Sequence, residues 1–271
     1  MTAIRLGHLY PAQMSMYGDR GNILTLQQRA SWRGLPLTVV PLGLGASAGA
    51  EVETCHGFFF GGGQDRDQAA LAEDLRTHKG APLRAAVAAG APLLAVCGGY
   101  QLLGSHYATA DGAIVPGLDL LPLWTQAGHR RLVGNVVVTP DPELGLGITR
   151  LVGFENHSGR THLGPACRPL GRTVVGEGNN GEDGGEGVWA GTVVGTYLHG
   201  PVLPRNPALA DWWLRAACRR AGWPDQLAPL DDGWELSAQA EGAERAGRER
   251  GPAGREREGG LRSLVRRAQR R

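Results

Sequence analysis

The stretch PLLAVCGGYQLLG, residues 92–104, places one cysteine and two glycines between two apolar runs. The first run, Leu93–Val96, predicts a buried strand, and a helix is expected to start at Gly99 and run to Ser105. A side chain on such a strand-to-helix turn projects at the carboxyl edge of a parallel sheet. Glycines permit the bend, and a helix N-terminus favours the thiolate. We therefore predict a nucleophile at Cys97, with a buried structural cysteine as the alternative.

The rest of the chain alternates strand-like and helix-like segments. Strand-like runs occupy residues 4–10, 37–42, 58–60 and 93–96, and helical patterns occupy residues 19–33, 65–78, 83–89 and 206–220. Beyond Pro116 the pattern becomes richer in strands, with runs at residues 135–139, 148–155, 173–176, 187–190 and 192–198. Asp19 is the predicted N-cap of the first helix. This alternation predicts an α/β fold with a mostly parallel sheet and helices on both faces.

The bulk composition excludes several classes of protein. The chain has 271 residues, of which 42% are apolar, and this is enough for a core. No apolar run is long enough to cross a bilayer, and the first residues lack a signal-peptide pattern, so a cytoplasmic location is expected. The four cysteines are widely spaced, which argues against a disulfide framework. No metal site is expected, because the acidic segment at residues 178–187 offers no spaced His or Cys ligands.

A base and an oxyanion-binding loop are the other parts that a catalytic thiol requires. In GTYLHGP the strand-like run at residues 192–198 delivers His199 to a strand end, although an exposed loop histidine is the alternative. In FFFGGGQDR, residues 58–66, three glycines follow a short strand. Their N–H groups can approach a developing oxyanion closely, although a plain glycine turn has the same composition.

These three motifs, the histidine motif extended to GTYLHGPVLPRNP (195–207), carry a family resemblance together with three further stretches. The further stretches are MSMYGDRGNILTLQQRA (14–30), RLVGN (131–135) and GFENHSGRT (153–161). The chain resembles class I glutamine amidotransferases of the cobyric-acid-synthase type, and within them the glutaminase subunits that serve lipid II amidation. The resemblance extends over nearly all of residues 1–225 and implies a flavodoxin-like fold.

The resemblance implies catalytic roles for four residues. Cys97 would attack the side-chain amide of glutamine. His199 would act first as the general base and then as the acid that protonates the leaving ammonia. Backbone groups of Gly62 and Gly98 would form the oxyanion hole.

The resemblance also implies substrate contacts. Arg131 and Gln101 would bind glutamine, and a guanidinium suits the task because it pairs bidentately with an α-carboxylate. Without the resemblance, Arg131 reads as a surface arginine beside Arg130. The segment FENH adds three residues that are expected to line the glutamine site or the ammonia exit, unless it is a hydrogen-bonded turn: Glu155, Asn156 and His157.

One position departs from the pattern of many class I amidotransferases. They carry a glutamate two residues after the histidine, which orients the imidazole, and here that position is Pro201. The site is therefore expected to be a Cys–His dyad within this chain. Two sources of a carboxylate are open, the partner subunit and Glu155.

The resemblance places the ligase chemistry on another polypeptide. Relatives of the cobyric-acid type carry an ATP-using domain in the same chain, whereas here the first strand begins at residue 4. ATP and Mg²⁺ are thus expected on a MurT-like Mur ligase in a heterodimer, and this chain has no GxxxxGK[ST] phosphate loop. The ammonia would amidate the D-glutamate α-carboxylate of lipid II to D-isoglutamine in peptidoglycan synthesis. Alternatives are a different amidated acceptor, a free-standing Cys–His amide hydrolase, and a degenerate interaction module.

The C-terminal segment has a different composition. Residues 237–271 contain ten Arg and five Glu, which gives this segment a net charge of +5. The whole chain carries +2, so the other 236 residues carry −3. We expect the amidotransferase domain to span residues 1–236 and the tail to be disordered. An apolar stripe near its end, at Leu261, Leu264, Val265 and Ala268, permits a short amphipathic helix. Such a helix would contact anionic lipid at the inner face of the membrane; a solvated tail is the alternative.

Overall fold

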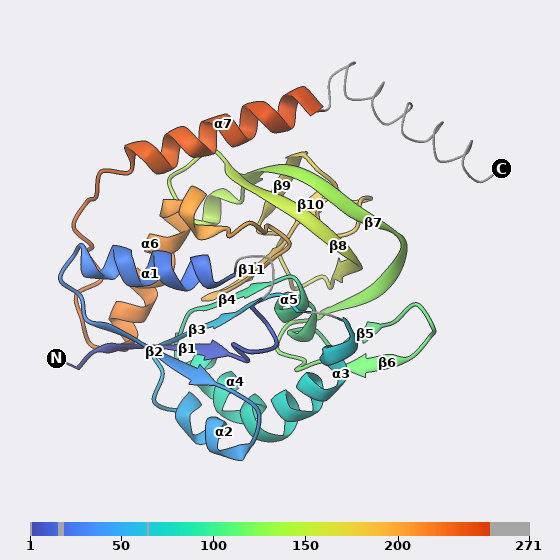
Figure 1. Cartoon of the computed structure of the whole chain (residues 1–271), viewed down its shortest axis with the longest axis horizontal. Coiled ribbons are helices and arrows are strands. Elements are labelled where there is room, and N and C mark those ends of the chain that lie inside the picture. Colours follow the sequence, from blue (N-terminus) through green and yellow to red (C-terminus); the bar gives the residue numbers. More distant parts are fainter. Residues whose placement is uncertain (1, 16–18, 64, 250–271) are drawn as a thin grey trace.

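The structure is a computed structural model that describes residues 2–15, 19–63 and 65–249 (Figure 1). Its centre is a six-stranded sheet in the order β11-β12-β4-β3-β1-β2. The strands are β1 (Ile4–Leu9), β2 (Leu37–Leu42), β3 (Gly57–Phe60), β4 (Leu93–Val96), β11 (Val188–Ala190) and β12 (Val193–Thr196). We call it the parallel sheet, because its only antiparallel pair is β11 with β12. The predicted α/β class is confirmed.

Strand β4 lies in the middle of the parallel sheet, and its neighbours are distant in sequence. Leu93 pairs with Phe58 of β3 on one side and with Val193 of β12 on the other. All residues of these three strands are buried, as expected for short apolar runs in a sheet covered on both faces. The carboxyl ends of β4 and β12 therefore meet at one edge.

Helices cover both faces of the parallel sheet (Figure 1). On one face lie α1 (Arg20–Ser31) and α6 (Pro207–Arg220). On the other lie α2 (Ala46–Val52), α3 (Asp65–Asp74), a π-helical turn (Leu75–Lys79) and α4 (Gly80–Ala88). Helix α2 was not predicted from the sequence.

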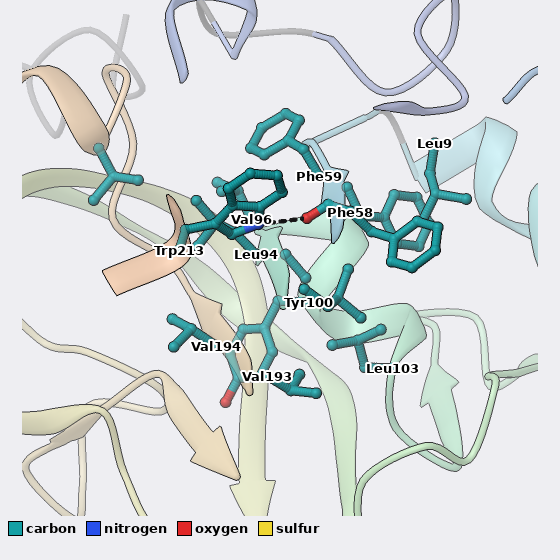
Figure 2. Packing of buried hydrophobic residues seen from close by; sticks show 14 of the residues in the cluster. Leu9, Phe58, Phe59, Leu94, Val96, Tyr100, Leu103, Val193, Val194 and Trp213 are labelled. Carbon is teal, nitrogen blue, oxygen red and sulfur yellow. Dashed lines mark hydrogen bonds between the residues drawn. The ribbon is translucent and has the colours of Figure 1, made fainter. Parts of the chain in front are cut away.

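The core fixes the short helix α5 (Gly98–Leu102) that follows β4. Tyr100 is fully buried and packs on β12, where a Cβ on Gly195 would lie 2.2 Å from the Tyr100 ring. On the opposite side of the sheet, Trp213 of α6 donates a hydrogen bond from Nε1 to the carbonyl oxygen of Phe58 (3.1 Å), as Figure 2 shows. The turn between β4 and α5 thus rests on close packing.

A second sheet was not expected as a separate layer. It has the order β10-β9-β7-β5-β6, and β8 also pairs with β7. Its strands are β5 (His106–Ala108), β6 (Ile114–Pro116), β7 (Leu123–Pro140), β8 (Leu151–Leu163), β9 (Gly171–Val175) and β10 (Gly185–Glu186). We call it the antiparallel sheet, because its only parallel pair is β5 with β7. The polar segment GFENHSGRT is not a turn but lies in β8, where every second residue is buried.

The prediction of disorder from residue 237 is wrong as far as residue 249. Helix α7 (Gly233–Glu249) runs along the antiparallel sheet (Figure 1), and Ala246 is buried in a small cluster with Val137 and Val152. Gln239 donates a hydrogen bond from Nε2 to the carbonyl oxygen of Arg205 (3.0 Å). The small apolar face is enough for a helix because a sheet is there to receive it.

The predicted amphipathic stripe at Leu261, Leu264, Val265 and Ala268 lies outside the described residues. Across the described ranges, no helix combines the length and apolar character needed to cross a membrane.

Candidate active site

Cys97 occupies the bend that the sequence predicts between β4 and α5. Its backbone has φ +50° and ψ −108°, a region that residues other than glycine seldom adopt. The Cys97 N–H donates to the carbonyl oxygen of Thr196 in β12 (2.9 Å), and the side chain is only 8% exposed. Strain of this kind costs on the order of 1–3 kcal/mol and is concentrated at functional sites.

His199 follows β12 and is held by both sheets. Its N–H donates to the carbonyl oxygen of Phe154 in β8 (2.8 Å), and the Phe154 N–H donates back to the carbonyl oxygen of His199 (3.2 Å). Burial, followed by the positive charge of Arg131, lowers the pKa of the imidazole to about 4. The ring is therefore neutral at pH 7, which is the form that accepts a proton.

Gly62 lies between these two side chains. A Cβ atom at Gly62 would lie 3.3 Å from the Cys97 Cβ and 3.5 Å from the His199 Cε1. The structure thus brings together the glycine loop, the cysteine and the histidine that the sequence motifs singled out. The space in front of the thiol exists because position 62 has no side chain.

Gly98 and Gly62 differ in their surroundings. Gly98 is buried, and a Cβ there would lie 3.1 Å from the Cε of Met14. The Gly62 N–H donates to the Oδ2 of Asp19 at 2.6 Å. Asp19 was predicted only as a helix cap, but its side chain caps no N–H of α1.

A narrow pocket beside the thiol is formed by both sheets. It is lined by Gly63, Gln68, Cys97, Gln101, Arg131, Asn156, His157 and Ser158. A larger cavity of about 920 Å³ lies between α1 and β2, but it contains none of the predicted site residues. We assign the site to the narrow pocket, because the strained Cys97 is one of the residues that line it.

Arg131 reaches this pocket from β7. Its Nε donates to the Asn156 Oδ1 (2.6 Å), and its terminal nitrogen Nη2 donates to the Asn156 carbonyl oxygen (3.1 Å). Arg131 is exposed, and Asn156 orients its guanidinium next to the pocket. That Arg131 binds glutamine stays a prediction.

Gln101 lies in a buried chain of side-chain amides and hydroxyls. Its Oε1 accepts a hydrogen bond from Gln68 (2.9 Å), and its Nε2 donates to the hydroxyl of Tyr197 (3.1 Å). Gln68 was missed, because one polar residue in a helical pattern carries no signal of its own. The Gln68 Oε1 is buried at the pocket and accepts no hydrogen bond within the described part of the chain.

His157 and Glu155 have supporting positions. The His157 ring stacks on Tyr197, with centroids 3.6 Å apart, and burial lowers its pKa to about 3. Glu155 directs its carboxylate to the N–H groups of Glu177 (2.9 Å) and Gly178 (3.0 Å). Burial raises the pKa of Glu155. These contacts anchor the loop at residues 177–178 and favour the partner over Glu155 as the source of a carboxylate for His199.

Glu186 is a buried residue that the sequence did not single out. It is fully buried, and it accepts hydrogen bonds from the Thr196 hydroxyl (3.0 Å) and the Tyr197 N–H (2.7 Å). Burial raises the pKa of this carboxyl to about 8. Glu186 thereby fixes the segment that leads from β12 to His199.

Comparisons with known proteins agree with this geometry. The model of the CobB/CobQ-like glutamine amidotransferase domain matches residues 5–207. The lipid II isoglutaminyl synthase (glutamine-hydrolyzing) subunit GatD of Staphylococcus aureus is 38% identical over 250 residues, which cover 92% of this chain and 99% of that protein. The same subunit of Streptococcus pneumoniae is 38% identical over 231 residues, covering 84% and 86%.

The fold itself has a match among solved structures. The glutaminase domain of Trypanosoma brucei CTPS with bound acivicin aligns with a TM-score of 0.50 and 13% identity, covering 83% of this chain and 98% of that domain. At this identity the match concerns the fold alone.

Proposed function

This chain belongs to the CobB/CobQ-like glutamine amidotransferase family, and we propose that it is a glutaminase subunit that hydrolyses L-glutamine and delivers the ammonia to a separate ligase. One observation carries the proposal. Cys97 lies in a strained bend next to a buried, neutral His199, at the mouth of a pocket that also contains Arg131.

The reaction would proceed through a thioester. The Cys97 sulfur attacks the side-chain amide carbon of glutamine while His199 takes the thiol proton. The C–N bond then breaks, and His199 gives its proton to the leaving ammonia. Water adds to the γ-glutamyl thioester, His199 takes a proton from it, and the C–S bond breaks to release glutamate and restore the thiol.

The pocket would select glutamine by its α-carbon substituents. The Arg131 guanidinium, oriented by Asn156, would pair with the α-carboxylate. The buried Gln68 Oε1 would accept a hydrogen bond from the substrate, because a buried acceptor is costly to leave unsatisfied. The Gly98 N–H would contribute to the oxyanion hole.

The acceptor and the partner follow from the relatives. The two relatives are named subunits of lipid II isoglutaminyl synthase, and the alignment covers most of each chain. We therefore propose that a MurT-like ligase binds ATP and Mg²⁺, activates the D-glutamate α-carboxylate of lipid II and forms D-isoglutamine. The complex would work in the cytoplasm at the inner face of the membrane. The ligase would also supply the carboxylate that is missing at Pro201.

The test is glutamate release from L-glutamine by the purified chain, alone and with a co-expressed MurT-like ligase. We expect release that increases with the ligase and falls at least about 10³-fold in Cys97→Ala. Cys167→Ala is the matched control, because Cys167 is a half-buried thiol that does not line the pocket. Release that persists in Cys97→Ala, or release equal with and without the ligase, would contradict the mechanism or the partner, respectively.

A further inference from the structure

Asp19 is a buried carboxyl that the proposed reaction does not use. It precedes α1, is fully buried, and makes no side-chain hydrogen bond that caps the helix. Its Oδ2 accepts the hydrogen bond from Gly62, and its Oδ1 is buried and accepts no hydrogen bond from any described residue. A helix cap would not require this arrangement, so the carboxyl has another role.

The carboxyl lies beside the reacting groups. A Cβ at Gly62 would lie 3.4 Å from the Asp19 Oδ2, a separation close to its distances from Cys97 and His199. A carboxylate on a backbone N–H next to the thiol has the charge and the hydrogen bond that a tetrahedral oxyanion would have. Asp19 therefore occupies the position that the oxyanion is expected to take.

The two occupants exclude one another. The Gly62 N–H can direct its hydrogen to one acceptor, and two negative oxygens at this position would repel each other in a poorly solvated site. One oxyanion donor is worth about 10²–10³ in kcat, so a donor that is already occupied withholds much of the catalytic effect.

We propose that Asp19 blocks the oxyanion hole, and that its carboxyl must move away from Gly62 before the chain can hydrolyse glutamine. The inference rests on the proposed glutaminase function. It implies that the chain alone is held in a weakly active state. Binding of the ligase would raise activity in part by moving the Asp19 carboxyl away from Gly62.

Met14, which also lies between β1 and α1, is close to the same glycine loop. A Cβ at Gly61 would lie 2.1 Å from the carbonyl oxygen of Met14, and one at Gly63 would lie 2.2 Å from the Met14 sulfur. Met14 also approaches Gly98. A shift of Asp19 and Met14 would therefore change the surroundings of both Gly62 and Gly98.

The protonation of Asp19 adds to this picture. Burial raises its pKa to about 7, although the hydrogen bond from Gly62 opposes the increase. The buried state is thus unfavourable for the charged carboxyl, and a move into solvent would recover its hydration. The contact is one that a modest change in structure can break.

The experiment compares the steady-state glutaminase activity of the wild type, Asp19→Ala and Asp19→Asn, each with and without the ligase. Under the proposal, Asp19→Ala alone has a kcat about 10-fold or more above the wild type, and its KM is nearly unchanged. Asp19→Asn gains less, because it keeps an acceptor for Gly62 and loses only the charge. The stimulation by the ligase shrinks in both variants.

Controls separate this inference from the function on which it rests. Asp111→Asn changes an exposed aspartate far along the chain and should leave kcat as in the wild type. The rate of Cys97 alkylation by iodoacetamide checks that each variant keeps an intact site. If the wild-type complex is active but both Asp19 variants alone are no faster than the wild-type chain alone, the proposed block by Asp19 is wrong and the glutaminase assignment stands. If no wild-type combination releases glutamate, both are overturned.

Discussion

The two sheets contribute to one pocket in different ways. The parallel sheet supplies Cys97 and His199, which follow the ends of the adjacent strands β4 and β12. The antiparallel sheet supplies Arg131 and Asn156 from within β7 and β8. Strand ends allow sharp turns that expose a reactive group, whereas strand faces hold side chains at a fixed spacing. Under the proposed function, chemistry and substrate binding are therefore separated between the two sheets.

The strongest test of this separation is His199→Ala. We expect kcat to fall about 10²- to 10⁴-fold, because a general acid–base group is removed, while KM changes little. The backbone pairing with Phe154 does not depend on the side chain, so the fold should persist, and circular dichroism would verify this. A kcat within tenfold of the wild type would show that the base lies elsewhere.

The matching test on the antiparallel sheet is Arg131→Ala. Loss of charge-assisted hydrogen bonds to a carboxylate should raise KM about 10- to 100-fold, with kcat nearly constant. Arg131→Lys should recover part of the loss, because the charge remains without the bidentate geometry. Arg130→Ala, on the exposed neighbour, is the control. A fall in kcat at constant KM would contradict the separation of catalysis and substrate binding between the two sheets.

Gln68→Leu tests a residue at the boundary between the sheets. Removal of the buried acceptor should raise KM about 3- to 10-fold, in line with one hydrogen bond between neutral groups. Gln126→Leu, at an exposed position of β7, is the matched control for the loss of an amide. An unchanged KM for glutamine would mean that the Gln68 Oε1 does not meet the substrate.

The smallest expected effect is on the pH dependence of kcat/KM. His199 must be neutral to accept a proton, and burial lowers its pKa from 6.5 to about 4. The acidic limb of the kcat/KM profile should therefore lie below pH 6.5, and activity should persist at pH 5.5. A carboxylate from the ligase would raise the pKa of His199 and move this limb toward neutral pH. A limb at 6.5 for the chain alone would contradict the burial of the imidazole.

The sequence predicts the parallel sheet well, and it predicts that Cys97 and His199 follow two of its strands, since short apolar runs followed by Gly, Cys or His are local signals. It predicts the antiparallel sheet poorly. Strand β7 contains the polar stretch GHRR, and its pairing with β8 is decided by distant residues. Asp19 is the N-cap residue of α1, as predicted, but only the tertiary structure determines whether its carboxyl faces α1 or Gly62. Helix α7 likewise depends on the sheet on which it packs.

The pairing of β4 with β12 has a consequence for synthesis on the ribosome. Leu93 pairs with Val193, and the whole antiparallel sheet and β11 are encoded between these two strands. A growing chain that ends before β12 leaves one edge of β4 unpaired, and such an edge promotes aggregation in incomplete chains. It also carries the thiol without the imidazole. Under the proposed mechanism, glutamine hydrolysis would wait until translation has passed His199, and prematurely terminated products would be inactive.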